Sequence, residues 1–133
     1  MRDSTYRHVV QILRDYKHTD RYIRQREEEL MYPYRAEEQV GGQGNLPGKP
    51  SERMAITIAE DRRLSNLENN RRVIDDCLNR ADIVTQEIIG YMYINDDKSA
   101  IGAAMEANIS DRHARRLHSQ FVEDVANELG LMV

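Results

Sequence analysis

Three arginines near the C-terminal end of the chain carry the clearest chemistry in this sequence. They are Arg112, Arg115 and Arg116. Guanidinium groups form paired hydrogen bonds with guanine edges and charged contacts with phosphate, so several on one side of a helix indicate nucleic-acid binding. Helical rotation of about 100° per residue leaves them facing solvent. The inward face would then hold Ala114, Leu117 and Phe121. This pattern predicts a helix that lies in the major groove of duplex DNA.

Four further residues of the same helix complete the predicted DNA contact. They are Ser110, Asp111, His113 and Ser119. The Ser110 hydroxyl can accept hydrogen bonds from free backbone N–H groups and so begin the helix. Asp111 is acidic, but its charge favours a helix N-terminus and its oxygens can accept a bond from cytosine. We expect His113 and His118 at the edges of the inward face.

The residues before this helix are of the types that a helix-turn-helix needs. Ala103 and Ala104 are small enough for two helices to cross closely, and Asn108 tolerates the left-handed backbone of a tight turn. Ile109 can anchor the turn in the core. These positions distinguish the segment from an ordinary helix with a solvated arginine face, which is the alternative interpretation.

Residues 82–133 as a whole are predicted to form a three-helix DNA-binding unit. Its expected helices cover 83–94 after an Asp82 cap, 98–106 after an Asp97 cap, and Ser110 to Leu129 before Gly130. From Asp82 to Glu106 the only basic residue is Lys98, so the arginine face is a local feature of the last helix.

Residues 1–81 are expected to supply oligomerisation or a contact with a partner. A helix over 4–31, capped by Asp3 or Ser4, has an apolar seam with alternating steps of three and four residues. The segment 32–50 holds all three prolines and four of the seven glycines, which predicts a long loop.

A second long helix is predicted from Glu52 to Arg80, entered through Pro50 and Ser51. Its apolar stripe is broken, and neither long helix can bury its stripe alone. An antiparallel helical hairpin and an intermolecular coiled coil would both hide these stripes, and the sequence leaves the two open.

The composition limits the classes of protein that fit. The chain has 133 residues, 40% hydrophobic and 32% charged, with a net charge of −4. The predicted elements are all helices, so we expect an all-α fold. We also expect a soluble cytoplasmic protein, because no apolar run approaches the roughly 20 residues of a membrane span. The single cysteine excludes a disulfide within the monomer. The histidine spacings favour no metal site, and no acid, base and nucleophile converge, so we expect no cofactor and no enzymatic activity.

Four short motifs, in order, resemble the RinA/ArpU-type late-transcription activators of Gram-positive phages and prophages. They are Glu29-Leu30-Met31-Tyr32-Pro33-Tyr34, Gly41-Gly42, Ser51-Glu52-Arg53-Met54-Ala55-Ile56-Thr57 and Ile109-Ser110-Asp111-Arg112. The resemblance spans nearly all of the chain. It implies binding to promoter DNA in the bacterial host cytoplasm, contact with host RNA polymerase, and activation of packaging and morphogenesis genes. The C-terminal part is also similar to region 4 of sigma factors, which is a likeness of fold alone.

Two other functions fit the same predicted elements. A phage small terminase subunit would use the helix-turn-helix to mark DNA for packaging, in a ring-shaped assembly. A helical adaptor would use the coiled coil and bind no DNA. The mass in solution separates a ring from the monomer or homodimer expected of a regulator, and a lack of duplex binding at low salt would favour the adaptor.

Overall fold

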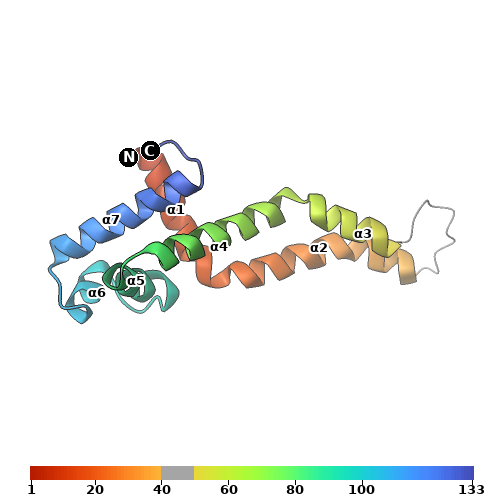
Figure 1. The fold of residues 1–133 in the computed structure, drawn as a ribbon. Helices are drawn as coiled ribbons and strands as arrows, with labels where there is room; N and C mark the ends of the chain where they lie inside the picture. Colours follow the sequence, from red (N-terminus) through yellow and green to blue (C-terminus); the bar gives the residue numbers. More distant parts are fainter. Residues whose placement is uncertain (40–49) are drawn as a thin grey trace. The chain divides into compact units, whose positions relative to one another are not determined.

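The computed structural model describes residues 1–39 and 50–133, with side chains for 1–32 and 51–133 (Figure 1). Every regular element in these ranges is helical, which confirms the predicted all-α class. The elements are α1 (Asp3–Asp15), a 3-10 turn (Tyr16–His18), α2 (Thr19–Gln39), α3 (Pro50–Glu60), α4 (Arg62–Arg80), α5 (Ile83–Ile89), a π-helical turn (Gly90–Ile94), α6 (Ala100–Glu106) and α7 (Asp111–Glu128). None of the helices described here is both long enough and apolar enough to cross a membrane.

These helices form two compact units that do not follow the order of the chain. One unit combines Met1–Lys17 with Asn70–Val133, and the other is His18–Asn69. The predicted division after residue 81 differs from these units, because α1 and the last part of α4 share a core with α5 and α7. Apolar spacing identifies the buried side of α1, but the partner of that side depends on the tertiary fold.

The first predicted helix is interrupted. At the 3-10 turn the Tyr16 hydroxyl hydrogen-bonds to the Asp75 carboxylate, and Lys17 Nζ lies 2.8 Å from Asp96 Oδ2. These contacts join residues far apart in the sequence, so helical spacing does not reveal them. The prediction of one continuous helix over 4–31 is therefore wrong.

The second predicted helix is interrupted at Asp61. Its Oδ1 accepts a hydrogen bond from the Leu64 N–H at 3.0 Å, as the side chain of a helix cap does. Because of this contact, α4 starts anew after α3 ends, and the prediction of one helix from Glu52 to Arg80 is wrong. The remaining apolar stripe continues along α4, where Leu64 and Ile74 are buried.

The first part of the predicted loop is helical. The backbone of α2 continues through Pro33 to Gln39, so the loop prediction over 32–50 is wrong for 32–39, and 40–49 lie outside the described residues. Proline lacks one N–H donor, but the other backbone donors of the helix remain. Because α3 begins at Pro50, Ser51 lies inside its first turn instead of capping it.

The start of α1 also differs from the prediction. Arg2 stands at the cap position, and no side-chain hydrogen bond caps this end. Asp3 lies inside the first turn, where its negative charge favours the helix N-terminus. Neither Asp3 nor Ser4 is therefore the cap.

In the unit His18–Asn69, α2 lies against α3, and an ion pair joins α2 to the residue that follows α3. Arg26 donates to Asp61 through Nε at 3.2 Å and through Nη2 at 2.8 Å, and its Nη1 donates to Glu29 at 2.9 Å. The hydrogen bonds from Arg26 lower the pKa of the Asp61 carboxyl to about 2, with a second contribution from the Leu64 N–H. Asp61 therefore stays ionised at neutral and mildly acidic pH.

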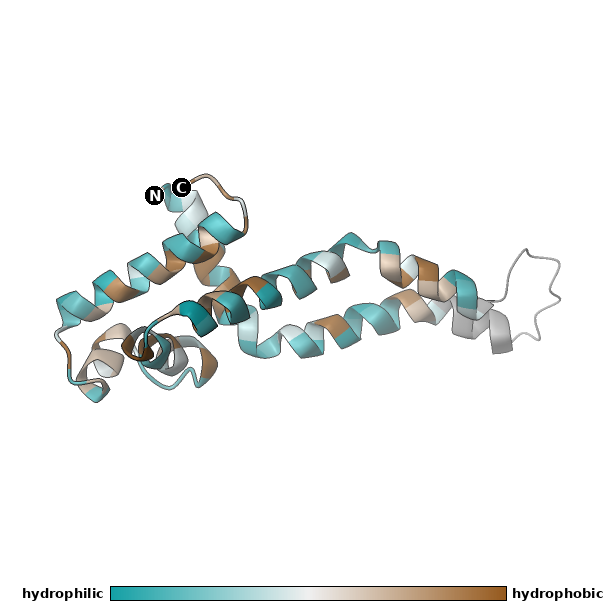
Figure 2. Ribbon diagram, in the orientation of Figure 1, coloured by the Kyte–Doolittle hydropathy of each residue, from teal (hydrophilic) through white to brown (hydrophobic). Residues whose placement is uncertain are grey.

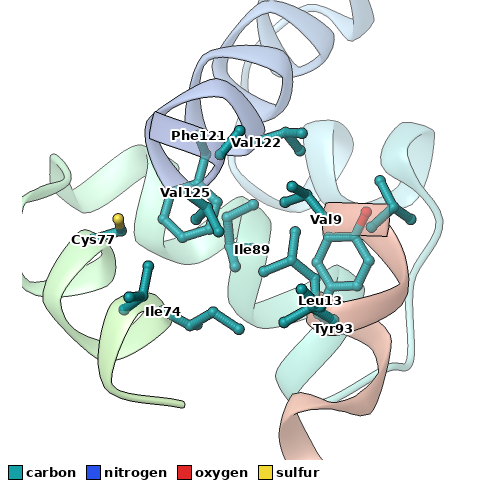
Figure 3. Packing of buried hydrophobic residues seen from close by; sticks show 13 residues of the cluster. Val9, Leu13, Ile74, Cys77, Ile89, Tyr93, Phe121, Val122 and Val125 are labelled. Carbon is teal, nitrogen blue, oxygen red and sulfur yellow. The ribbon is translucent and has the colours of Figure 1, made fainter. Parts of the chain in front are cut away.

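The other unit has a core to which α1, α4, α5, the π-helical turn and α7 all contribute (Figure 3). The core includes Val9 and Leu13 of α1, Ile74 and Cys77 of α4, Ile89 of α5, Tyr93 of the π-helical turn, and Phe121, Val122 and Val125 of α7. Figure 2 shows hydrophilic and hydrophobic residues alternating along α7, as expected for a helix that is buried on one side. This core holds α7 so that its opposite side remains exposed.

The C-terminal tail docks only in part. Leu131 packs against the core, but Met132 and Val133 are 67% and 43% exposed. The Thr5 hydroxyl donates to the Met132 carbonyl at 2.7 Å, so the two chain ends lie side by side (Figure 1). Of the apolar tail, only Leu131 is therefore packed on the core.

Two other predicted helix ends are confirmed. Asp82 Oδ1 accepts from the Thr85 N–H at 2.7 Å and caps α5, and this bond lowers the pKa of the Asp82 carboxyl. Gly130 has a φ of 75°, in the left-handed region, directly after the last turn of α7. Both ends depend on neighbouring residues alone, which is why the sequence predicts them.

Candidate nucleic-acid interface

The turn between α6 and α7 has the local geometry expected from its residue types. Asn108 has a φ of 58°, in the left-handed region, and the Ile109 N–H donates to the Ala104 carbonyl at 3.0 Å. Ser110 Oγ accepts from the His113 N–H at 3.0 Å, so Ser110 is the cap of α7, as predicted. The start of α7 is thus fixed by three consecutive residues.

Small side chains allow α6 and α7 to approach each other closely. Ala103 and Ala104 are 0% and 2% exposed, and they form a second buried cluster with Ile88 and Ala114. Ala114 and Phe121 lie on the buried side of α7, as predicted, and Leu117 is partly buried. The inward face of α7 is therefore the one that the sequence indicates.

The cap of α6 differs from the prediction. Ser99 Oγ accepts from the Gly102 N–H at 3.2 Å, and α6 begins at Ala100. The N–H groups of Asp97 and Lys98 both donate to the Tyr91 carbonyl, at 3.2 and 3.3 Å, which keeps these residues in the preceding turn. The prediction of Asp97 as the cap is wrong.

All three arginines of α7 are exposed, as is Ser119, but their settings differ. Arg115 Nη2 lies 3.0 Å from Asp111 Oδ2. Arg116 Nη2 lies 2.8 Å from His113 Nδ1, which must be the acceptor because a guanidinium only donates. The Arg112 side chain has no hydrogen bond or ion pair with any described residue.

A hollow of about 460 Å³ lies at the start of α7. It is lined by Ser110, Arg112, His113 and Arg116, and none of these residues is acidic. The first turn of an 18-residue helix also presents free N–H groups and a positive partial charge. Two guanidinium groups and a helix N-terminus are groups that favour an anion. The structure thus brings four of the predicted contact residues together, while Asp111, Arg115 and Ser119 do not line the hollow.

His118 is buried, which corrects its expected place at the edge of the inward face. Its side chain is 7% exposed, and its Nε2 lies 2.6 Å from the Tyr93 hydroxyl. The two rings stack with their centroids 5.7 Å apart, and the Tyr6 ring approaches His118 edge-on at 6.2 Å. These contacts hold α7 against α1 and the π-helical turn. No sequence spacing indicates them, because they form only in the tertiary fold.

Acidification should destabilise this unit through His118. Burial lowers the pKa of His118 from its ordinary value of 6.5, so the unfolded chain binds the proton more readily than the folded chain. The stability is therefore present above pH 6.5 and is lost as the pH falls towards the lower pKa of the folded state. Each tenfold difference in proton affinity corresponds to about 1.4 kcal/mol.

The test is the free energy of unfolding in urea, measured at about pH 7.5 and about pH 5.5. The decrease between the two values should be smaller in His118→Gln than in the wild type. His8→Gln, at an exposed position of α1, is the matched control and should keep the wild-type decrease. An equal decrease in all three proteins would contradict the assignment.

Cys77 is a small buried residue of the core, 4% exposed. Arg80 Nη2 lies 3.7 Å from Cys77 Sγ and also pairs with Glu128 at 2.9 Å. Burial raises the pKa of the Cys77 thiol, so the thiol stays protonated at neutral pH. Among the side chains that the structure describes, those of residues 1–32 and 51–133, no three from His, Cys, Asp or Glu are grouped as a metal site requires.

Comparison with known proteins identifies one family whose sequence model matches residues 1–127, nearly the whole chain. The family is described as "Protein of unknown function (DUF722)". No curated protein and no solved structure matches the chain.

Proposed function

The chain belongs to the DUF722 family, and from this premise we propose that it binds duplex DNA at specific sequences and activates transcription. The observation that carries the proposal is the set of three exposed arginines on the first half of α7, a helix that Ser110 caps and that packs on α6. In this proposal α6 and α7 form a helix-turn-helix, and α7 lies in the major groove.

The residues at the start of α7 make different contacts with the duplex in this proposal. Ser110 and the free N–H groups of the first turn contact phosphates and set the position of the helix on the duplex. The three arginines contact phosphates and the edges of guanine bases. His113 keeps Arg116 oriented through its Nδ1, and Ser119 extends the contact by one further turn of the helix.

The electrostatics require the interface to be local. The chain as a whole has a net charge of −4, so DNA would be repelled from most of its surface. The hollow at the start of α7 is lined by two arginines and no acid. This contrast favours one orientation of the protein on the duplex.

The proposed role in transcription extends from the sequence resemblance to RinA/ArpU-type activators. The promoter would be that of phage packaging and morphogenesis genes in a bacterial host, and the partner would be host RNA polymerase. The unit His18–Asn69 offers the surface for self-association or for the polymerase. In a homodimer, two copies of α7 would occupy half-sites about 34–36 Å apart, or a multiple of that distance.

The test begins with selection of bound sequences from random duplexes, followed by a mobility-shift titration of the best sequence at several salt concentrations. We expect enrichment of one motif and a plot of log affinity against log salt with a slope between about −2 and −3, for two or three neutralised phosphates. The mass of the free protein should be that of a monomer or dimer. A closed ring would favour the small terminase subunit, and a lack of duplex binding at low salt would favour the helical adaptor.

A further inference from the structure

We propose that Asp111 determines the sequence discrimination of this interface by holding Arg115 for contact with a base edge, while Arg112 and Arg116 bind phosphate. This inference rests on the proposed DNA-binding function and assigns different tasks to arginines that the sequence presents as equivalent.

The three arginines lie on two neighbouring stripes of α7. Asp111 and Arg115 are four residues apart, which places them on one side of the helix, where Asp111 Oδ2 and Arg115 Nη2 are 3.0 Å apart. Arg112 and Arg116 are also four residues apart, and each follows a member of the first pair by one residue. They line the hollow together with Ser110. The geometry therefore separates a neutralised arginine from two that keep their charge.

Charge decides which ligand each stripe prefers. Arg112 and Arg116 add two positive charges to a hollow without an acid, which suits a phosphate group. The Arg115 guanidinium is balanced by the Asp111 carboxylate, so the pair has no net attraction for phosphate. Among the residues that the structure describes, this guanidinium pairs with Asp111 through Nη2 alone, which leaves further N–H donors that can pair with O6 and N7 of guanine.

The pair is not explained by folding stability. Arg115 and Asp111 side chains are 67% and 40% exposed, and exposed ion pairs of this kind contribute little to stability. The other carboxylate oxygen, Asp111 Oδ1, is buried and has no hydrogen-bond partner in the structure, which is unfavourable for the folded state. The Asp111 charge also favours the N-terminus of α7, but that effect does not require Asp111 to pair with Arg115, so the pair itself points to a role toward a ligand.

Asp111 would act mainly against wrong sequences. On unrelated DNA, its charge is repelled by phosphates and Arg115 finds no guanine edge, so the complex is weakened. On the correct site, Arg115 pairs with guanine, and this contact compensates for the repulsion. The carboxylate of Asp111 lowers the attraction to any DNA. The ratio between the affinity for the correct site and the affinity for unrelated DNA nevertheless depends on Asp111.

The test compares Asp111→Asn with the wild type on the selected duplex and on a scrambled duplex of the same length. In Asp111→Asn, affinity for the scrambled duplex should rise about tenfold. Discrimination, which is the ratio of the affinities for the selected and the scrambled duplex, should fall by a similar factor. The slope of log affinity against log salt should steepen by about one. Asp124→Asn is the matched control, since Asp124 is an exposed acid more than three turns further along α7. Its discrimination should stay within about twofold of the wild type.

Single arginine variants complete the test and do not depend on the behaviour of Asp111→Asn. Arg112→Ala should weaken binding to both duplexes alike and reduce the salt slope by about one, whereas Arg115→Ala should lose discrimination with little change in slope. If the wild type binds DNA but Asp111→Asn keeps the wild-type discrimination, or if the two arginine variants behave alike, this inference is overturned alone. If the wild type binds no duplex, the proposed function is overturned with it.

Discussion

Replacement of Arg112, Arg115 and Arg116 together by alanine is expected to lower affinity for the selected duplex by about a thousandfold. A single arginine contact to a base contributes about 1–3 kcal/mol to the binding free energy, and a contact to a phosphate contributes an amount that depends on salt. The loss of three arginine side chains should therefore leave only weak binding. All three side chains are exposed, so the variant should keep its fold. A mobility-shift titration at constant salt measures the loss, and far-ultraviolet circular dichroism checks the helices.

The control removes the same number of charges elsewhere. Arg24, Arg62 and Arg63 are exposed and belong to the unit His18–Asn69. Their triple alanine variant has the same net charge as the first one, and its affinity should stay within about fivefold of the wild type. Equal losses in both variants would mean that overall charge controls binding and that α7 is not the interface.

Replacement of Phe121 by alanine is expected to destabilise the unit that contains α7 by about 3–5 kcal/mol. Phe121 is 2% exposed and belongs to the core that joins α7 to α1, α4 and α5 (Figure 3). The substitution removes a large aromatic side chain of that core and leaves a cavity that rigid neighbouring helices cannot fill. Urea unfolding followed by circular dichroism gives the free energy of unfolding.

Two companion variants show whether this loss comes from packing. Phe121→Leu keeps most of the apolar volume and should lose no more than about 1.5 kcal/mol. Met105→Ala, on the exposed side of α6, should change stability by no more than about 0.5 kcal/mol, because the Met105 side chain is 73% exposed. A loss below 1 kcal/mol in Phe121→Ala would contradict the packing of α7 described here.

The long N-terminal helices show where prediction from the sequence stops. The apolar spacing of the first helix correctly identifies Val9, Leu13 and Ile23 as buried positions. It does not show that the helix breaks at Tyr16, or that α1 packs with α7 while α2 packs with α3. Helical periodicity describes one side of a helix, and it contains no information on which distant segment covers that side.

The candidate site was predicted more closely than the rest because its features are local. Ser110, Asn108 and Gly130 act on backbone groups within a few residues, so their types alone determine the ends of α7. The Arg115–Asp111 ion pair and the Arg116–His113 hydrogen bond follow in the same way, from spacings of four and three residues.

The sequence by itself therefore determined the helical class, the start and end of α7, and the exposure of its arginines. Tertiary structure alone decided that α1 joins the C-terminal core and that His118 is buried against Tyr93. The physical reason is the range of the interactions. Caps and helix faces depend on neighbours along the chain, whereas burial depends on which segments the whole fold brings together.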